Sequence, residues 1–539
     1  MPVSEETQQS LLDNPILISL CNSHYQYMRL FVFAIGGTGS RVLTSLVMQL
    51  AAGMCPKDHE GNPIKNLTIV PIIVDPHEDN AGLQQVKSLL NHYRTIRKRI
   101  YGDDPNGEGF FGVKIETLRE AEPESGVSSD NFFFRMQRVS DNSFDKFIGL
   151  ESMSLENKLF AQMLFSDEEL QTEMKEGFYG SPNIGCVALN EFRRSEDFTA
   201  FRTAYNPGDR IFFIGSIFGG TGASGLPLFI SSIRDLGHRD SDDDGRAACS
   251  EAPIGALIVM PYFSITPDED SPINENDFTI KTRSALRYYY TNLNQYINNI
   301  YYISDPDGTK AFENDPGSGN QSKNKAHIVE FAGSLAMMDF LAEPETDMLF
   351  KQDSFGRVVV EKCSTKAYGL VTDNSHIHFK GLSAQTDELV MKPMMSFYLL
   401  REFMQNYLKD MLEKPFAKDH TPKIQKSIYD NREIKEFFKM FDEWTSQMKD
   451  HGPSAHNLEL FKQVNDKNYA GAFHDEPSTK KGLFGGRKDL KPKDIQLMLD
   501  KAAQEVGDKE PQEKRWFTLA QIAMNKLIDE MYDTDTLLK

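Results

Sequence analysis

Two short glycine-rich turns carry the residue types best suited to chemistry in this chain of 539 residues. The first turn, GGTGS at 36–40, follows the apolar run 30–35, and the second, GGTGAS at 219–224, follows the largely apolar run 210–217. Glycine tolerates positive φ and has no side chain, so consecutive backbone N–H groups can surround an anion where a helix begins. The two turns together predict a site for the phosphate groups of a nucleotide.

The candidate phosphate ligands are the backbone N–H groups of both turns and the hydroxyl groups of their threonine and serine residues. They are Gly36, Gly37, Thr38, Gly39 and Ser40 in the first turn and Gly219, Gly220, Thr221, Gly222, Ala223 and Ser224 in the second. The hydroxyl groups could also cap the helices that follow. Either turn taken alone could instead be a tight strand-to-helix connection without a ligand.

The sequence around the turns predicts an α/β fold with a parallel sheet. Buried strands are expected at 30–35, 67–74, 210–217, 254–260 and 300–304, with helical segments between them. Strands that alternate with helices pair in parallel. Ligands of such sheets bind at the carboxyl ends of the strands, which is where both glycine turns lie.

Two further features are expected near this edge of the sheet. Asp75 follows the strand at 67–74 and is predicted at the rim of the same pocket, with a solvated turn residue as the alternative. Apolar residues at helical spacing predict a long central helix over 324–341. The sheet is expected to end near this helix.

Shifts in composition predict five segments along the chain. They are an N-terminal helical extension at 1–28, a nucleotide-binding domain at 29–345 with an insertion at about 78–175, a mixed and then helical C-terminal subdomain at 346–465, a Gly/Lys/Pro-rich linker at 466–492 and a helical segment at 493–539.

The overall composition excludes several classes of partner. The chain has 79 acidic and 59 basic residues, and this excess of acid argues against nucleic acid or an anionic membrane surface, which bind basic proteins. The five cysteines form no C-x-x-C pair for zinc or redox chemistry. No apolar run reaches the ~20 residues of a membrane span. A soluble, cytoplasmic protein without direct membrane insertion is therefore expected.

Three familiar motifs do not fit the turns. The P-loop pattern G-x-x-x-x-G-K-[ST] does not occur, so no lysine is placed to reach terminal phosphates. The glycines at 36–39 do not form G-x-G-x-x-G, although Asp75 could take the ribose-binding position, so an NAD(P)- or FAD-dependent oxidoreductase stays an alternative. Ser224 lacks the G-x-S-x-G context of a serine hydrolase.

In their order along the chain, these motifs resemble the nucleotide-binding loops of the tubulin/FtsZ superfamily. The turn at 219–224 is similar to the signature G-G-G-T-G-[ST]-G, with Phe218 and Ser224 in place of two glycines, and the turn at 36–40 is similar to the first nucleotide loop. The segment GSPNIG at 180–185 resembles the loop that faces the γ-phosphate. The resemblance covers roughly 29–345 without the insertion and is one of pattern, not of close identity.

This resemblance implies a domain that binds GTP or GDP, with a parallel sheet and a long core helix. It implies nucleotide contacts for Asp75, Asn183, Gly185, Arg283 and Asn324, and Mg²⁺ as the cation that would shield the phosphates. Asn324 would meet the base from the start of the core helix. An exposed helical arginine and a helix start remain the alternatives for Arg283 and Asn324.

The acidic loop 342–347 resembles the family loop that completes GTP hydrolysis in the next subunit, although it lacks the pattern Asn-x-Asp-x-x-Asp. The resemblance therefore implies that Glu345 and Asp347 act as catalytic residues on a neighbouring molecule. A bacterial tubulin-like protein of this type would self-associate head to tail into cytoskeletal filaments, with weak or interface-dependent GTPase activity. The alternative is a non-polymerising nucleotide sensor that meets a protein partner through the insertion or the C-terminal helices.

Overall fold

The computed structural model describes the greater part of the chain. The described residues are 28–76, 81–123, 132–134, 143–174, 178, 181–236, 248–263, 275–305, 324–373, 376–380, 384–408, 430–449, 458–462, 468–473, 489–506 and 510–531. The expected N-terminal extension lies outside them apart from Met28, and so does the greater part of the expected linker.

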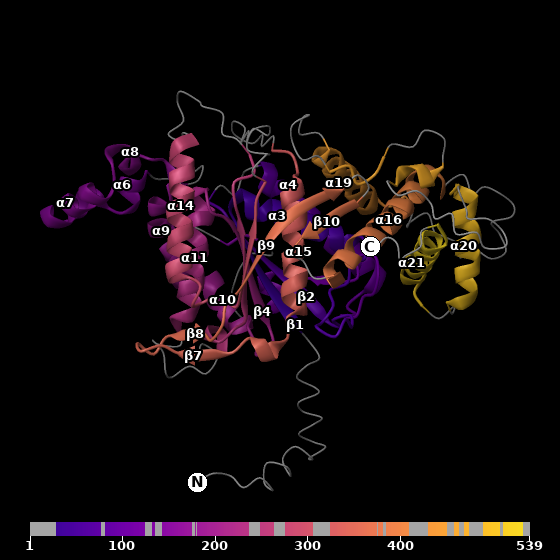
Figure 1. The fold of residues 1–539 in the computed structure, drawn as a ribbon, viewed down its shortest axis with the longest axis horizontal. Coiled ribbons are helices and arrows are strands. Elements are labelled where there is room, and N and C mark those ends of the chain that lie inside the picture. Colours follow the sequence, from indigo (N-terminus) through magenta and orange to yellow (C-terminus); the bar gives the residue numbers. More distant parts are fainter. Residues whose placement is uncertain are drawn as a thin grey trace, which may run out of the picture.

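An eight-stranded sheet forms the centre of the molecule, with the strand order β10-β9-β6-β5-β4-β1-β2-β3 (Figure 1). All neighbouring strands in it run parallel except β10, which is antiparallel to β9. The strands are β1 (Met28–Ile35), β2 (Leu67–Val74), β3 (Lys114–Ile115), β4 (Arg210–Ser216), β5 (Ile254–Val259), β6 (Asn299–Ile303), β9 (Ser364–Asp373) and β10 (His376–Lys380). The predicted α/β class with a parallel sheet is confirmed.

The strand order reverses its direction between β1 and β4. From β1 the sheet grows through β2 to β3 on one side, and from β4 it grows through β5 to β6 on the other. The order 3-2-1-4-5-6 is that of doubly wound sheets, which bind ligands in the crevice at this switch point. Ile35 pairs with Val74 and with Gly215, so the ends of these three strands lie level at the carboxyl edge.

Helices bury both faces of the sheet because successive strand residues point to opposite sides. Val32 and Ala34 of β1 belong to one core, and Phe31 and Phe33 belong to the other. The first face is covered by α3 (Gly36–Ala51), α4 (Ala81–Tyr101), α15 (Ile328–Ala342) and α16 (Ala384–Asn406), and the second by α9 (Pro182–Leu189), α10 (Glu196–Ala204), α11 (Gly220–Arg234) and α14 (Glu275–Asn292) (Figure 1).

The helix α15 is buried along nearly its whole length, from Ile328 to Leu341. It packs between α3 and the strands β5 and β6. A helix that is apolar on all sides belongs in the interior of a protein. Neither α15 nor any other helix in the described part of the chain is long and apolar enough to cross a membrane.

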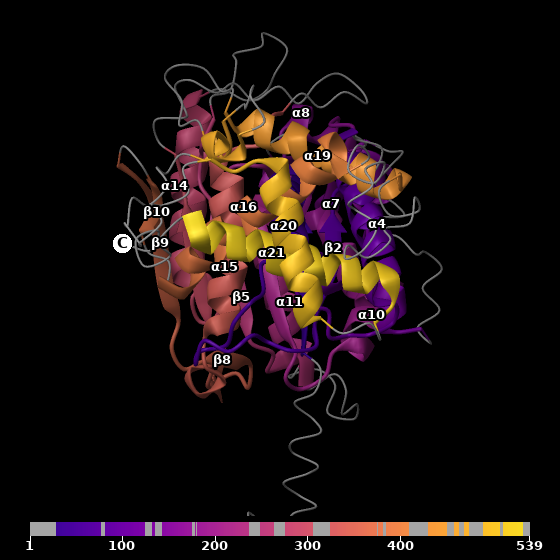
Figure 2. The same cartoon turned by 90° about the vertical axis from the view of Figure 1, so that its right-hand side faces the viewer.

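The C-terminal helices extend the first core outward from the sheet (Figure 2). They are α19 (Arg432–Met448), α20 (Pro492–Glu505) and α21 (Gln512–Met531). The helix α19 packs against α4, and α21 packs against α4 and α16. Phe437 of α19 and Phe517 of α21 are buried in the same core as α3, so this region is continuous with the α/β layers.

Smaller elements surround these layers, and among them α7 projects away from the sheet (Figure 1). The short helices are α5 (Leu118–Ala121), α6 (Phe144–Phe147), α7 (Leu155–Leu164) and α8 (Asp167–Leu170), and the strands β7 (Phe350–Gln352) and β8 (Val358–Val360) form a hairpin. The 3₁₀ turns are η1 (Leu150–Ser152), η3 (Asn190–Arg194), η5 (Glu345–Asp347) and η7 (Tyr469–Ala472).

Three expected boundaries differ in the structure. The sheet does not end near the core helix, because β9 pairs in parallel with β6 beyond it. Part of the expected insertion belongs to the layers, since α4 is the crossover that leads from β2 to the edge strand β3. The core helix begins at Ile328 and not at 324, because His327 caps it by accepting a hydrogen bond from the N–H of Val329.

Arg234 at the end of α11 ties three parts of the fold together. Its side chain is fully buried and donates to the carbonyl oxygens of Tyr296 at 2.9 Å, Ser250 at 2.6 Å and Ala252 at 2.8 Å. These carbonyl groups belong to the segments that lead into β5 and β6. The guanidinium therefore anchors the second-face helix to the starts of two central strands.

We expect Arg234→Met to lower the free energy of unfolding by about 3 kcal/mol or more, because each buried carbonyl left without a donor costs about 1–3 kcal/mol. Urea denaturation would measure the change. Arg287→Met, at an exposed position of α14, is the matched control and should stay within about 0.5 kcal/mol of the wild type. Equal effects of the two substitutions would show that Arg234 is not an anchor.

Candidate functional site

The two glycine turns meet at the switch point of the sheet. The helix α3 begins at Gly36, whose φ is +73°, and α11 begins at Gly220 after the N-cap residue Gly219. A Cβ atom placed on Gly36 would lie 3.6 Å from the backbone nitrogen of Gly222. The N-termini of two helices that cover opposite faces therefore converge on one place at the carboxyl edge of the sheet.

The glycines of these turns differ in how closely other atoms pack against them. A Cβ on Gly39 would lie 2.8 Å from the carbonyl carbon of Ala34, and a Cβ on Gly222 would lie 2.7 Å from backbone atoms of Ser216. Gly39 and Gly222 are thus required for close packing of each helix on its strand. Gly37 is exposed, and a Cβ there would meet only the Arg41 guanidinium at 3.6 Å.

The two serine hydroxyls bond within their own helices. Ser40 Oγ donates to the carbonyl oxygen of Gly36 at 3.2 Å, and Ser224 Oγ donates to that of Gly220 at 2.6 Å. Ser224 also packs closely on Gly185 of α9, where a Cβ would lie 2.2 Å from Ser224 Oγ. Gly185 and Ser224 therefore join α9 to α11.

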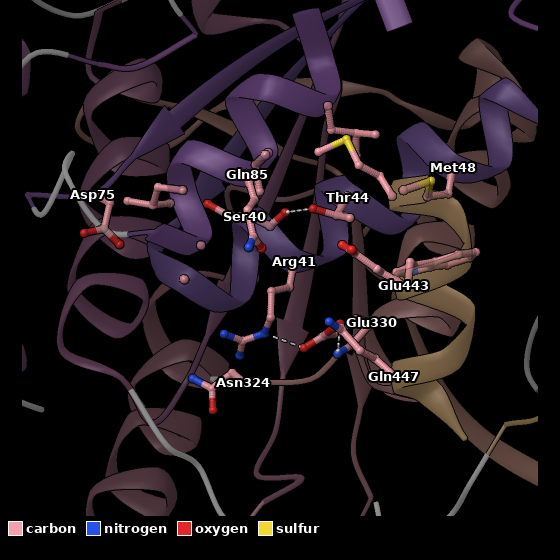
Figure 3. A pocket seen from close by; sticks show the side chains of 18 residues that line it. Ser40, Arg41, Thr44, Met48, Asp75, Gln85, Asn324, Glu330, Glu443 and Gln447 are labelled. Atoms are coloured by element: carbon pink, nitrogen blue, oxygen red, sulfur yellow. Dashed lines mark hydrogen bonds and ion pairs between the residues drawn. The ribbon is translucent and has the colours of Figure 1, made fainter. Parts of the chain in front are cut away.

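A cavity of about 310 Å³ opens beside the first turn (Figure 3). One face of α3, the end of β2, the first half of α4, the approach to α15 and the C-terminal half of α19 line it. Gly37, Ser40, Asp75 and Asn324 are the predicted site residues among its walls. This volume is within the range of pockets that hold small organic ligands.

Arg41 is a candidate site residue that the sequence analysis missed. Its Nε donates to Glu330 Oε1 at 2.5 Å, and its Nη2 donates to the hydroxyl of Tyr262 at 2.7 Å. The Tyr262 hydroxyl in turn donates to Glu330 Oε1 at 2.8 Å. Burial raises the pKa of Tyr262 well above its usual value, so the phenol stays neutral and keeps its proton for Glu330.

This network fixes a positive charge one helical turn after Gly37. Both members of the pair line the cavity, and the Arg41 side chain, at 22% exposed, is the more accessible of the two because Glu330 is 1% exposed. The first turn of α3 adds N–H groups that have no partner within the helix. Groups of this kind are suited to an anionic ligand. A basic residue directly after the first turn was the signal in the sequence.

Several predicted nucleotide contacts lie away from the cavity. Asn183 is in the first turn of α9, and its amide donates to Glu169 Oε1 at 2.6 Å. Arg283 is an exposed residue of α14. These two residues, Gly185 and the second turn are not among the cavity's lining residues in the described part of the chain. The second turn is held on α14 by Tyr289, whose hydroxyl donates to the carbonyl oxygen of Ala223 at 3.0 Å.

The acidic turn η5 lies at the opposite edge of the sheet. Arg210, the first residue of β4, donates to the carbonyl oxygens of Phe340 at 2.6 Å and Glu343 at 2.9 Å, which holds the end of α15 beside the amino ends of the strands. Glu345 and Asp347 are exposed there. Within one molecule the sheet separates them from the glycine turns.

Glu343 of the same loop has a structural partner. Its carboxylate accepts a hydrogen bond from Lys366 at 2.6 Å, and Lys366 also contacts Asp339 of α15. Burial opposes the charge of Lys366, but the two carboxylates outweigh it and raise the pKa of the ammonium group. Within the described residues, no group of three or more His, Cys, Asp or Glu side chains is placed to hold a metal ion.

We expect Gly39→Ala and Gly222→Ala each to lower the free energy of unfolding by about 1–3 kcal/mol, because the added methyl group must displace backbone atoms. Gly37→Ala is the control within the first turn and should stay within about 0.5 kcal/mol. Denaturant midpoints of the three variants would measure this. If Gly37→Ala lowered the free energy of unfolding as much as the other two substitutions, the first turn would be closely packed on every side.

Comparison of the sequence with protein-family models and with curated protein sequences finds no match. The function of the chain is therefore inferred from its strand order, its two converging turns and the cavity beside them.

Proposed function

We propose that the protein binds GTP and GDP at the switch point of the sheet, as a tubulin/FtsZ-like protein that assembles head to tail. The observation that carries the proposal is the convergence of the two glycine turns, with Gly36 and Gly222 in close contact where β1 and β4 end. Two helix N-termini directed at one place favour a ligand with several negative charges. A polyphosphate is such a ligand.

The phosphate groups would lie against Gly37 and the Arg41 guanidinium at one side and against the first turn of α11 at the other. Guanidinium groups suit phosphate because they offer several N–H donors in a fixed plane. Mg²⁺ is usually held by phosphate oxygens and one or two carboxylates. Asp75 is the carboxylate that lines this end of the cavity and would fill that role.

Hydrolysis would need a second subunit. Glu345 and Asp347 are exposed at the amino edge of the strands, and the glycine turns are at the carboxyl edge. When molecules stack with the same orientation, the acidic turn of one faces the nucleotide of the next. The carboxylates could then orient a water molecule for attack on the γ-phosphorus, with GDP as the leaving group.

Specific observations also favour two alternative functions. Dinucleotide-binding folds also have the strand order 3-2-1-4-5-6 and an acidic residue after β2. An NAD(P)-dependent oxidoreductase is therefore one alternative. The wall that α19 adds to the cavity favours a nucleotide sensor that does not polymerise. Binding and assembly experiments separate these functions.

We expect Gly37→Asp to weaken GTP binding at least about tenfold, because a carboxylate beside the phosphates costs more than the 1.4 kcal/mol that corresponds to tenfold. The same substitution should leave stability unchanged or slightly raised, since aspartate is favourable in the first turn of a helix. Calorimetric titration and thermal unfolding without nucleotide measure the two effects. Gly37→Ala is the control that keeps GTP binding.

Titration of the wild type with ATP and NAD in parallel tests the alternatives. Preferential NAD binding would favour the oxidoreductase, and unchanged GTP binding by Gly37→Asp would place the phosphates elsewhere.

We expect the double variant Glu345→Gln, Asp347→Asn to bind GTP normally but to lose GTP turnover. Gly37→Asp should lose turnover at GTP concentrations that saturate the wild type but not this variant. A mixture of the two should regain turnover, because an intact site on one molecule meets intact carboxylates on its neighbour. Phosphate release and sedimentation with GTP or GDP measure the effects. Turnover that neither falls in the double variant nor recovers in the mixture contradicts the head-to-tail arrangement.

A further inference from the structure

The cavity beside α3 has two chemically different ends. Gly37, Arg41, Thr44 and Met48 follow one another on the face of α3 that lines it, so the cavity runs along three helical turns, or about 16 Å. In Figure 3, Asp75 lies at one end and Met48 and Glu443 lie at the other, with Ser40 and Arg41 between them. Toward the first end lie the Arg41 guanidinium and the N–H groups of the first turn, together with the carboxylate of Asp75, whereas the second end has a different lining.

The second end combines apolar side chains and one indole with the carboxylate of Glu443. Met48 of α3, Leu89 of α4 and Met440 and Trp444 of α19 line it. Methionine packs favourably on aromatic rings through its polarisable sulfur, and a tryptophan ring is a good surface for stacking. This end therefore suits a flat, apolar ring system and not a phosphate.

Trp444 also carries an unused hydrogen-bond donor. Trp444 is 3% exposed, and its indole Nε1, like that of Trp516 outside the cavity, has no acceptor among the described residues. A buried N–H group without an acceptor is unfavourable.

We propose that α19 holds the base of the bound nucleotide, with the base packed between α4 and Trp444 while the phosphates occupy the Gly37 end. The proposal rests on the proposed GTP binding and adds the site of the base. It makes the C-terminal region part of the nucleotide site. Occupancy of the site would then fasten α19 to the α/β layers.

The two tryptophans of the chain allow a direct test. Trp516 lies in α21 and is not among the residues that line the cavity. Trp516→Phe leaves Trp444 as the only emitting tryptophan, and Trp444→Phe leaves Trp516 as the matched control. Each variant is titrated with GTP, guanosine and inorganic triphosphate, and GTP binding is measured separately by calorimetry.

We expect GTP and guanosine to change the emission of Trp444 over the concentrations at which they bind, and to leave that of Trp516 unchanged. Triphosphate should displace GTP without changing Trp444 emission by itself. Met440→Ala should weaken guanosine binding roughly tenfold, because it removes apolar contact with the base, and leave triphosphate binding as it is.

The possible failures are distinguishable. GTP that binds calorimetrically without changing Trp444 emission overturns the placement of the base but leaves the proposed function intact. A change caused equally by triphosphate overturns the division of the cavity into two ends. If no nucleotide binds the wild type at all, the proposed function fails and this inference fails with it.

Discussion

The close approach of two backbone turns at the centre of the sheet is the constraint on which the rest of the structure depends. β1 and β4 are neighbours, so the helices that follow them must leave the same edge toward opposite faces. Side chains at Gly39 or Gly222 would collide with the strands from which those helices depart. The glycines of the turns leave backbone N–H groups accessible at the switch point, and such groups attract anions.

The chain as a whole carries a formal net charge of −20, so any attraction of an anion to this region has to come from nearby positive groups. Long-range attraction of the proposed nucleotide would therefore be unfavourable, and its binding would have to come from short contacts. Glu330 and Tyr262 provide such a contact indirectly, because they hold the Arg41 guanidinium in one position before any ligand arrives. Because the Arg41 side chain is already ordered in the free protein, binding of the proposed nucleotide would not include the entropic cost of ordering it.

Local features of the fold could be predicted from the sequence and long-range contacts could not. The strand at 67–74 has the bounds of β2, because its apolar run and its flanking polar residues are local signals. Arg41 and Glu330 are 289 positions apart, and no periodicity links them. The wall formed by α19 and the pairing of β9 with β6 are likewise tertiary contacts. Among the predicted ligands, Ser40 and Ser224 each sit four residues after a helix carbonyl, a spacing at which serine commonly bonds its own helix.

The buried helix α15 has a mechanical consequence. Its first turn holds Glu330 at the cavity, and its last turns hold Asp339 and the carbonyl oxygens that Arg210 binds at the far edge. Because its side chains are enclosed on all sides, a local shift of α15 would disturb its packing against the surrounding core. The helix is about 22 Å long. It thus gives a direct structural connection between Glu330 at one edge of the sheet and the turn at Glu345 at the other.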